Sequence, residues 1–158
     1  MTNLSSAVAL LGRMLLSSIF LVSGLPKLFN YADAAAYLAT FGLPPQALPV
    51  IIALELGCGL AILVGVMTRT SALLLAALAV ATAVTFHRNI GVDAELVNFM
   101  KNIAIAGGLL QLVANGPGRF AVMPGRDRDA EEPAPEQPAV APQPGVAQFP
   151  PSAIARRR

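Results

Sequence analysis

Four long apolar runs dominate the 158-residue sequence. They cover residues 5–25, 48–67, 70–87 and about 96–114, and each approaches the roughly 20 residues that an α-helix needs to cross about 30 Å of hydrocarbon. Hydrophobic residues make up 55% of the chain and charged residues only 13%, which is typical of a membrane protein and excludes an ordinary soluble domain. The sequence therefore predicts an all-α, polytopic membrane protein built as a four-transmembrane-helix bundle.

The connections between these runs differ in kind. Only 67–70 separates the second run from the third, so these two helices are expected to form an antiparallel hairpin. Residues 31–41 are too short to span a membrane but have helix-compatible flanks. Aromatic side chains in this segment predict an interfacial helix lying at the level of the lipid headgroups; they are Tyr31, Tyr37 and Phe41.

The end of the chain has another composition. Residues 124–151 hold eight of the 13 prolines and show no apolar periodicity. Such a segment buries too little apolar surface to offset its ordering entropy, so 122–158 is predicted to be a disordered, Pro/Ala-rich cytoplasmic tail. Residues 1–121 then form the transmembrane domain. The tail contains a minimal PxxP at 135–138, a motif too common to identify a partner.

Charge and cysteine content exclude several classes of function. Nine acidic and eleven basic residues nearly cancel, and the only basic cluster is 156–158, so no nucleic-acid-binding face is predicted. A single cysteine, Cys58, excludes an internal disulfide and a Cys-rich metal site. A single histidine, His87, leaves too few ligands for a multi-histidine metal centre. We expect neither a metal site nor an intrinsic cofactor.

Basic residues also predict the orientation. With four spans both termini lie on one side of the bilayer, and that side collects Arg69, Arg119 and the arginines of the tail. The positive-inside rule then places the N and C termini in the cytoplasm. Arg69 and Arg119 are interpreted as membrane anchors that contact anionic headgroups.

Three charged residues fall inside the apolar runs, where charges are costly and usually face the bundle interior. Counting 1.5 Å per residue from the cytoplasmic ends puts Arg13 at about 12 Å, Glu55 at about 18 Å and Lys101 at about 20 Å. Glu55 is therefore expected to lie level with Lys101 and within reach of Arg13. Further polar groups are expected toward the outer face: Lys27, His87, Asn98 and Asn102.

This arrangement has two interpretations. The first is an outward-facing polar pocket in which a substrate headgroup or a proton meets Glu55. The second is a structural Arg–Glu–Lys network that fixes the register of the helices. His87 is likewise interpreted either as an interfacial residue at a helix end or as a proton relay.

Small residues form a stripe on the third run. Ala72, Ala76, Ala79 and Ala83 recur at intervals of four and three, which places them along one helical face where another backbone approaches closely. Tight helix packing is the first interpretation. A homo-oligomer assembled through this stripe is the alternative.

Several short segments together resemble the DoxX family of small bacterial membrane proteins. The resemblance covers about residues 8–122 and rests on Arg13, 19–27, 55–57, 65–69, His87, Lys101–Asn102 and 116–120. It implies a four-helix fold in the bacterial inner membrane and a role linked to quinones or to redox partners. Matching the family pattern nominates Arg13, Lys27, Glu55, Arg69, His87, Lys101 and Arg119 as functional positions.

The function expected from these observations is that of a membrane subunit in a quinone-linked or redox-associated complex. Glu55, Lys101 and His87 are the candidate catalytic residues, which would donate hydrogen bonds and move protons. Arg13, Lys27 and Asn102 are the candidate substrate-binding residues. A redox partner would supply the electrons. The alternatives are a non-enzymatic scaffold whose tail recruits a cytosolic partner and, third, a small transporter.

Overall fold

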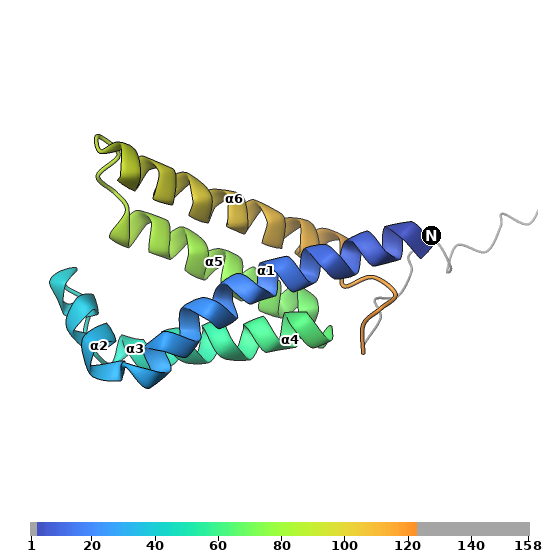
Figure 1. Ribbon diagram of the computed structural model, residues 1–158, viewed down its shortest axis with the longest axis horizontal. Coiled ribbons are helices and arrows are strands. Elements are labelled where there is room, and N and C mark those ends of the chain that lie inside the picture. Colours follow the sequence, from blue (N-terminus) through green and yellow to red (C-terminus); the bar gives the residue numbers. More distant parts are fainter. Residues whose placement is uncertain (1–2, 123–158) are drawn as a thin grey trace, which may run out of the picture. The chain divides into compact units, whose positions relative to one another are not determined.

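The computed structural model describes residues 3–122, and within that range the chain is helical without a strand (Figure 1). The tail predicted for 122–158 lies, apart from Val122, outside the described residues. The helices in chain order are α1 (Asn3–Phe29), α2 (Tyr31–Thr40), α3 (Ala47–Ala53), the π-helical turn η1 (Leu54–Cys58), α4 (Gly59–Val64), α5 (Thr68–Phe86) and α6 (Asp93–Asn115).

Four helical segments are long and apolar enough to cross a membrane. They are Leu4–Phe29, Ala47–Val64, Thr68–Phe86 and Asp93–Asn115 in the described part of the chain. The second of them joins α3, η1 and α4 into one helix with a π-helical turn in its middle. The predicted all-α fold with four spans is therefore confirmed.

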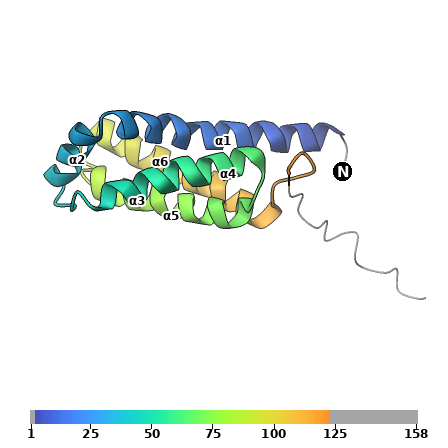
Figure 2. The same ribbon diagram turned by 90° about the horizontal axis from the view of Figure 1, so that it is seen from below.

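Successive spans run antiparallel (Figure 1). Residues 65–67 form the turn between α4 and α5. Gly65 ends α4 in the left-handed conformation, with a φ of 84°, which glycine adopts without steric cost. Figure 1 shows α5 and α6 side by side, and this pair makes the most extensive contact in the bundle. Helix α1 packs mainly along α4 and η1 (Figure 2).

The main core lies where α1, α4, α5 and α6 meet. It contains Phe20, Ile62, Leu75 and Leu109 together with Ala72, Ala76 and Ala79 of the alanine stripe. Ala83 is buried as well. Because this chain's own helices cover the stripe, it is not available to a second copy. The expected route to a homo-oligomer through these alanines is therefore wrong, since small side chains on α5 serve the close approach of neighbouring helices within the chain.

A smaller core attaches α2 to the start of the second span. Leu38 is the one buried residue of α2, and it packs with Leu48 and Ile52. The ring of Tyr37 stacks on Phe86 with centroids 5.8 Å apart, and Phe41 meets Phe86 edge to face at 4.7 Å. The helix lies at the end of the bundle opposite Asn3 (Figure 2). The short helix predicted for 31–41 is thus present, and its place at the level of the headgroups stays a prediction.

Candidate functional site

Glu55 lies on the π-helical turn η1, which interrupts the second span. A turn of this kind widens a helix locally, leaves its backbone pattern irregular and is frequent at functional sites. Gly24 of α1 faces it closely. A Cβ atom on Gly24 would lie 2.9 Å from Leu56 Cδ2 and 3.0 Å from Glu55 Cβ. The absence of a side chain at Gly24 therefore allows α1 to approach the turn and brings its polar side chains to Glu55.

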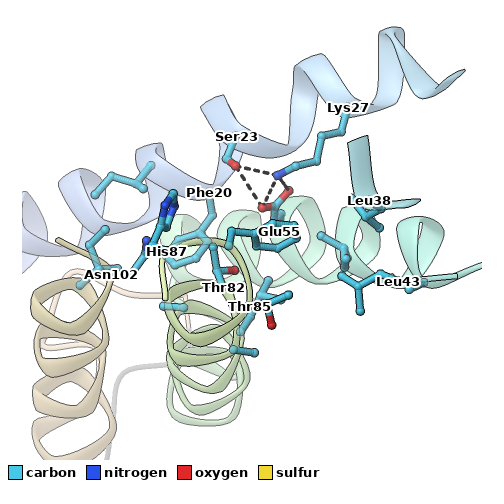
Figure 3. Close-up of a pocket in the computed structure, with 18 of the residues that line it drawn as sticks. Phe20, Ser23, Lys27, Leu38, Leu43, Glu55, Thr82, Thr85, His87 and Asn102 are labelled. Atoms are coloured by element: carbon cyan, nitrogen blue, oxygen red, sulfur yellow. Dashed lines mark hydrogen bonds and ion pairs between the residues drawn. The ribbon is translucent and has the colours of Figure 1, made fainter. Parts of the chain in front are cut away.

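Lys27 and Ser23 are those side chains. The Nζ of Lys27 donates hydrogen bonds to both carboxylate oxygens of Glu55, at 2.6 and 2.7 Å, and to Ser23 Oγ at 2.8 Å. The Ser23 hydroxyl in turn donates to Glu55 Oε1 at 3.0 Å (Figure 3). The side chain of Glu55 is 8% exposed and that of Lys27 is 27% exposed. The result is a hydrogen-bonded ion pair, nearly buried on its acidic side and accessible on its basic side.

The ion pair borders a cavity of about 420 Å³. Its walls come from α1, α2, the second span, α5 and the middle of α6, and most of them are apolar. Three aromatic residues, Phe20, Tyr37 and Phe86, contribute to these walls. The polar lining residues are few: Ser23, Lys27, Glu55, Thr82, Thr85, His87 and Asn102.

His87 and Asn102 belong to the opposite wall from Lys27 (Figure 3). His87 caps the C-terminus of α5, and its Nδ1 lies 2.9 Å from Oε2 of Glu95 in the first turn of α6. The negative charge of Glu95 at the N-terminus of α6 agrees with the helix dipole. Asn102 donates its amide hydrogen to the carbonyl of Asn98 at 3.1 Å.

Arg13 does not contact Glu55, contrary to the expectation from depth. Its guanidinium donates instead to three backbone carbonyls, those of Pro117 at 2.9 Å, Phe120 at 2.6 Å and Leu63 at 3.3 Å. The residue is 2% exposed. Side chains on a helix lean toward its N-terminus. Arg13 therefore leans away from Glu55, whereas Lys27, about one turn beyond Gly24 on the same helix, leans back toward it.

Lys101 also lies apart from Glu55, because it is on the exposed face of α6. It is exposed, does not line the cavity, and donates only to Asn98 Oδ1 at 3.4 Å, one turn nearer the N-terminus of α6. The expected Arg13–Glu55–Lys101 network is therefore wrong. Counting residues along each span estimates the depth of a side chain in the membrane but not the direction in which it points. In the structure Lys27 contacts Glu55 in place of both Arg13 and Lys101.

Sequence reasoning missed three features of the site. The first is the joint contact of Ser23 and Lys27 with Glu55. The two residues are four apart on a helix, which was a usable signal that both face the same neighbour. Glu95 was not selected from the sequence, although it stands eight residues after the single histidine. The π-helical turn leaves no recognisable pattern in the sequence.

The two arginines predicted as anchors are both exposed. Arg69 begins α5 close to Gly116, where an added Cβ would lie 3.4 Å from the arginine Nε. Arg119 follows α6. Both arginines belong to the end of the bundle at which the second span finishes. There the backbone N–H of Val122 donates to the carbonyl of Val64. Their role as anchors stays a prediction.

The comparisons with known proteins agree with this architecture. The sequence profile of the DoxX family matches residues 8–88, which include Arg13, Lys27, Glu55 and His87. The chain belongs to the DoxX family. No solved structure matches it.

Two Escherichia coli (strain K12) proteins are similar over most of their length. Inner membrane protein YqjF is 39% identical over 122 residues, which cover 77% of this chain and 94% of the relative. Inner membrane protein YphA is 32% identical over 120 residues, which cover 72% of this chain and 86% of the relative. With its four apolar spans, the present chain is a DoxX-family integral membrane protein of the inner-membrane type.

Proposed function

We propose that this DoxX-family protein is a membrane subunit of a quinone-linked complex and that its cavity binds the quinone ring. The observation that carries the proposal is the Lys27–Glu55 ion pair at the edge of a largely apolar cavity of about 420 Å³. Small-molecule sites are typically concave and apolar, of roughly 300–1,000 Å³, with a few convergent polar groups. The cavity meets this description.

The walls suit a flat, lipid-soluble ring. Phe20, Tyr37 and Phe86 supply aromatic surface, and aromatic rings pack favourably against one another in offset or edge-to-face arrangements. Ile19 lines the cavity while 44% exposed, and Ala81 lines it while also exposed. The cavity thus reaches the lipid-facing surface of the bundle. That opening would admit a ligand from the bilayer and accommodate a hydrocarbon tail.

The polar residues supply binding and proton exchange. A bound quinone would contribute the redox chemistry, which takes up or releases two electrons and two protons, and a partner subunit would exchange the electrons. Lys27 would hold one ligand oxygen by redirecting one of its three hydrogen bonds. Glu55 would accept or return a proton at its carboxylate, with the Ser23 hydroxyl between the two side chains. His87 and Asn102 would bind at the other wall.

This assignment revises the set of candidate residues. Lys27, Glu55, His87 and Asn102 line one cavity. Arg13 and Lys101 lie outside it, so we give Arg13 a structural role and Lys101 none in ligand binding.

The proposed topology places the cavity toward the periplasm. The described chain ends share one end of the bundle, because Gly118 approaches Ala9 of α1 and Val122 bonds to Val64. Arg69 and Arg119 belong to the same end. By the positive-inside rule this end is cytoplasmic, and the cavity, formed by the C-terminal parts of α1 and α5, is then near the outer surface.

Helix α6 is the best surface for the partner subunit. Ala106 and Leu109 are its only buried residues. Its exposed face carries Ala104, Gly107 and Gln111, and a Cβ on Gly107 would meet nothing within 4 Å. Small and amide side chains favour contact between helices in a membrane.

Mass spectrometry of small molecules and proteins retained by the gently purified protein tests this proposal. We expect the wild-type protein to retain quinone and Glu55→Gln to lose most of it. Lys101→Gln is the matched control, because it also removes one charge from a span but lies outside the cavity. The absence of quinone from the wild type, with an equimolar protein partner present in all three samples, would contradict the proposal and favour a scaffold.

A further inference from the structure

The wall of the cavity formed by His87 differs chemically from the wall formed by Lys27. The Nδ1 of His87 lies 2.9 Å from Glu95 Oε2. An ionised carboxylate only accepts hydrogen bonds, so Nδ1 must carry the hydrogen. The partner of one ring nitrogen sets the state of the other. In the neutral imidazole, Nε2 is then a hydrogen-bond acceptor, and His87 lines the cavity.

The other polar groups on this wall do not discriminate. The amide nitrogen of Asn102 donates one of its two hydrogens to the backbone carbonyl of Asn98 at 3.1 Å, which leaves the second hydrogen as a donor and the side-chain oxygen as an acceptor. The hydroxyls of Thr82 and Thr85 likewise both donate and accept. Lys27, at the opposite wall, only donates. The cavity therefore has a donor at Lys27 and an acceptor at His87.

We infer that the cavity selects a lipid-soluble ring bearing a hydroxyl group, as in a hydroquinone, over the corresponding dicarbonyl, and that Glu95 is the positioning residue for this choice. The inference rests on the proposed function. The ligand hydroxyl donates to His87 Nε2, and a second ligand oxygen accepts from Lys27. A carbonyl at the His87 end would meet a lone pair instead of a hydrogen.

The selectivity depends on the charge of His87. Lys27, Tyr37 and Glu55 line the same cavity. Arg88 follows the histidine in the chain, and Asp93 and Glu95 are the acidic residues in the first turn of α6. A protonated imidazole donates from both nitrogens. A proton on Nε2 would therefore remove the acceptor and, with it, the preference for the hydroxyl form.

Equilibrium binding to the full-length protein in nanodiscs tests the selectivity. The probes are a short-chain benzoquinone, its hydroquinone and the dimethyl ether of that hydroquinone, measured without oxygen against empty nanodiscs. One hydrogen bond corresponds to about a tenfold preference for the hydroquinone at pH 8. We expect His87→Phe to abolish the preference and Glu95→Gln to reduce it. Asp93→Asn, which removes an acid from the same turn of α6, should retain it.

Equal binding of the three probes by the wild type would overturn the inference and leave the proposed function standing. A second measurement needs no ligand. The chain has one histidine, so ¹⁵N-histidine labelling of protein freed of any tag gives a single imidazole. We expect the Nδ1–H tautomer in the wild type at pH 8 and a shift toward Nε2–H in Glu95→Gln. An Nε2–H tautomer in the wild type would overturn the inference, whereas Nδ1–H without binding of any probe would support the acceptor and refute the proposed function.

Discussion

The two ends of the bundle each bury a charged side chain, and they hold it in opposite ways. Arg13 is 2% exposed and bonds only to backbone carbonyls, which cannot leave without unfolding the segments that carry them. Glu55 is 6% exposed, but its partners are the side chains of Lys27 and Ser23, beside a cavity. A side-chain partner can rotate toward a ligand. A backbone partner fixes the fold.

The difference separates structural charge from functional charge in one small membrane protein. Arg13 joins α1, the end of α4 and the segment after α6 at one point. Its five donors in a planar fork suit several carbonyls at once. The Lys27–Glu55 pair joins only two spans and leaves the lysine accessible. We therefore expect substitutions at the Arg13 end to affect mainly stability and those at the Glu55 end to affect ligand binding more.

Arg13→Leu should have the largest effect on stability. The change leaves the carbonyls of Leu63, Pro117 and Phe120 without their donor, and each stranded buried carbonyl costs about 1–3 kcal/mol. We expect a loss of about 3–5 kcal/mol in the free energy of unfolding, measured by denaturant titration in micelles. Arg13→Lys should recover only part, because an ammonium lacks the planar fork.

Lys101→Leu is the control for Arg13→Leu, since Lys101 also lies in a span but is exposed. It should change stability by less than about 0.5 kcal/mol. Equal losses of unfolding free energy in the two variants would show that the hydrogen bonds of Arg13 do not stabilise this end of the bundle.

Lys27→Met should have the next largest effect, because it leaves Glu55 buried without its cation. Removing one partner of a buried pair costs about 3–5 kcal/mol, and the lower part of that range applies here since the lysine is partly exposed. The double variant Lys27→Met with Glu55→Gln should regain most of this stability while losing ligand. Unfolding titrations of the single and double variants measure the coupling.

If the double variant were as unstable as Lys27→Met alone, the pair would not be an energetic unit. The comparison between the two ends would then lose its basis. Glu55→Gln alone should cost less than Lys27→Met, because the freed ammonium reaches water or headgroups.

Much of the fold was predictable, because membrane spans are encoded in length and hydropathy. The four spans and the short helix near 31–41 agree with the structure, and the tight turn predicted at 67–70 is present at 65–67. The family was identified from short motifs as well. These features depend on local sequence alone.

The partners of the charged residues were not predictable from depth. Arg13 leans away from Glu55 and Lys101 is on the exposed face of α6, while Lys27 converges on Glu55. The π-helical turn also rotates the second span around Glu55 in a way that regular helix geometry does not give. Side-chain direction and helix rotation are tertiary properties, so the site itself had to come from the structure.

Gly24→Ala should perturb the cavity end without changing its charge. The added methyl would lie within about 3 Å of Leu56 and Glu55, but the leucine side chain can shift. Overpacking costs about 1–3 kcal/mol, and we expect about 1 kcal/mol together with weaker quinone retention. Gly57→Ala is the matched control on the same turn, since its Cβ would meet nothing within 4 Å. If quinone retention fell equally in Gly24→Ala and Gly57→Ala, binding would not depend on the close approach of α1 to η1.

Tyr37→Leu should have the smallest effect and report on how firmly α2 covers the cavity. The change keeps an apolar side chain but removes the stacking of Tyr37 on Phe86 and its edge contact with Phe41. Aromatic pairs contribute about 0.5–1.5 kcal/mol beyond their buried area. Amide hydrogen exchange should therefore become faster in α2 and change little in α5 near Arg69. The reason is that separate contacts stabilise the two ends of the bundle. Tyr31→Leu, on the same helix and without a ring partner in the described structure, should leave exchange unchanged; faster exchange throughout Tyr37→Leu would mean that the two ends open together.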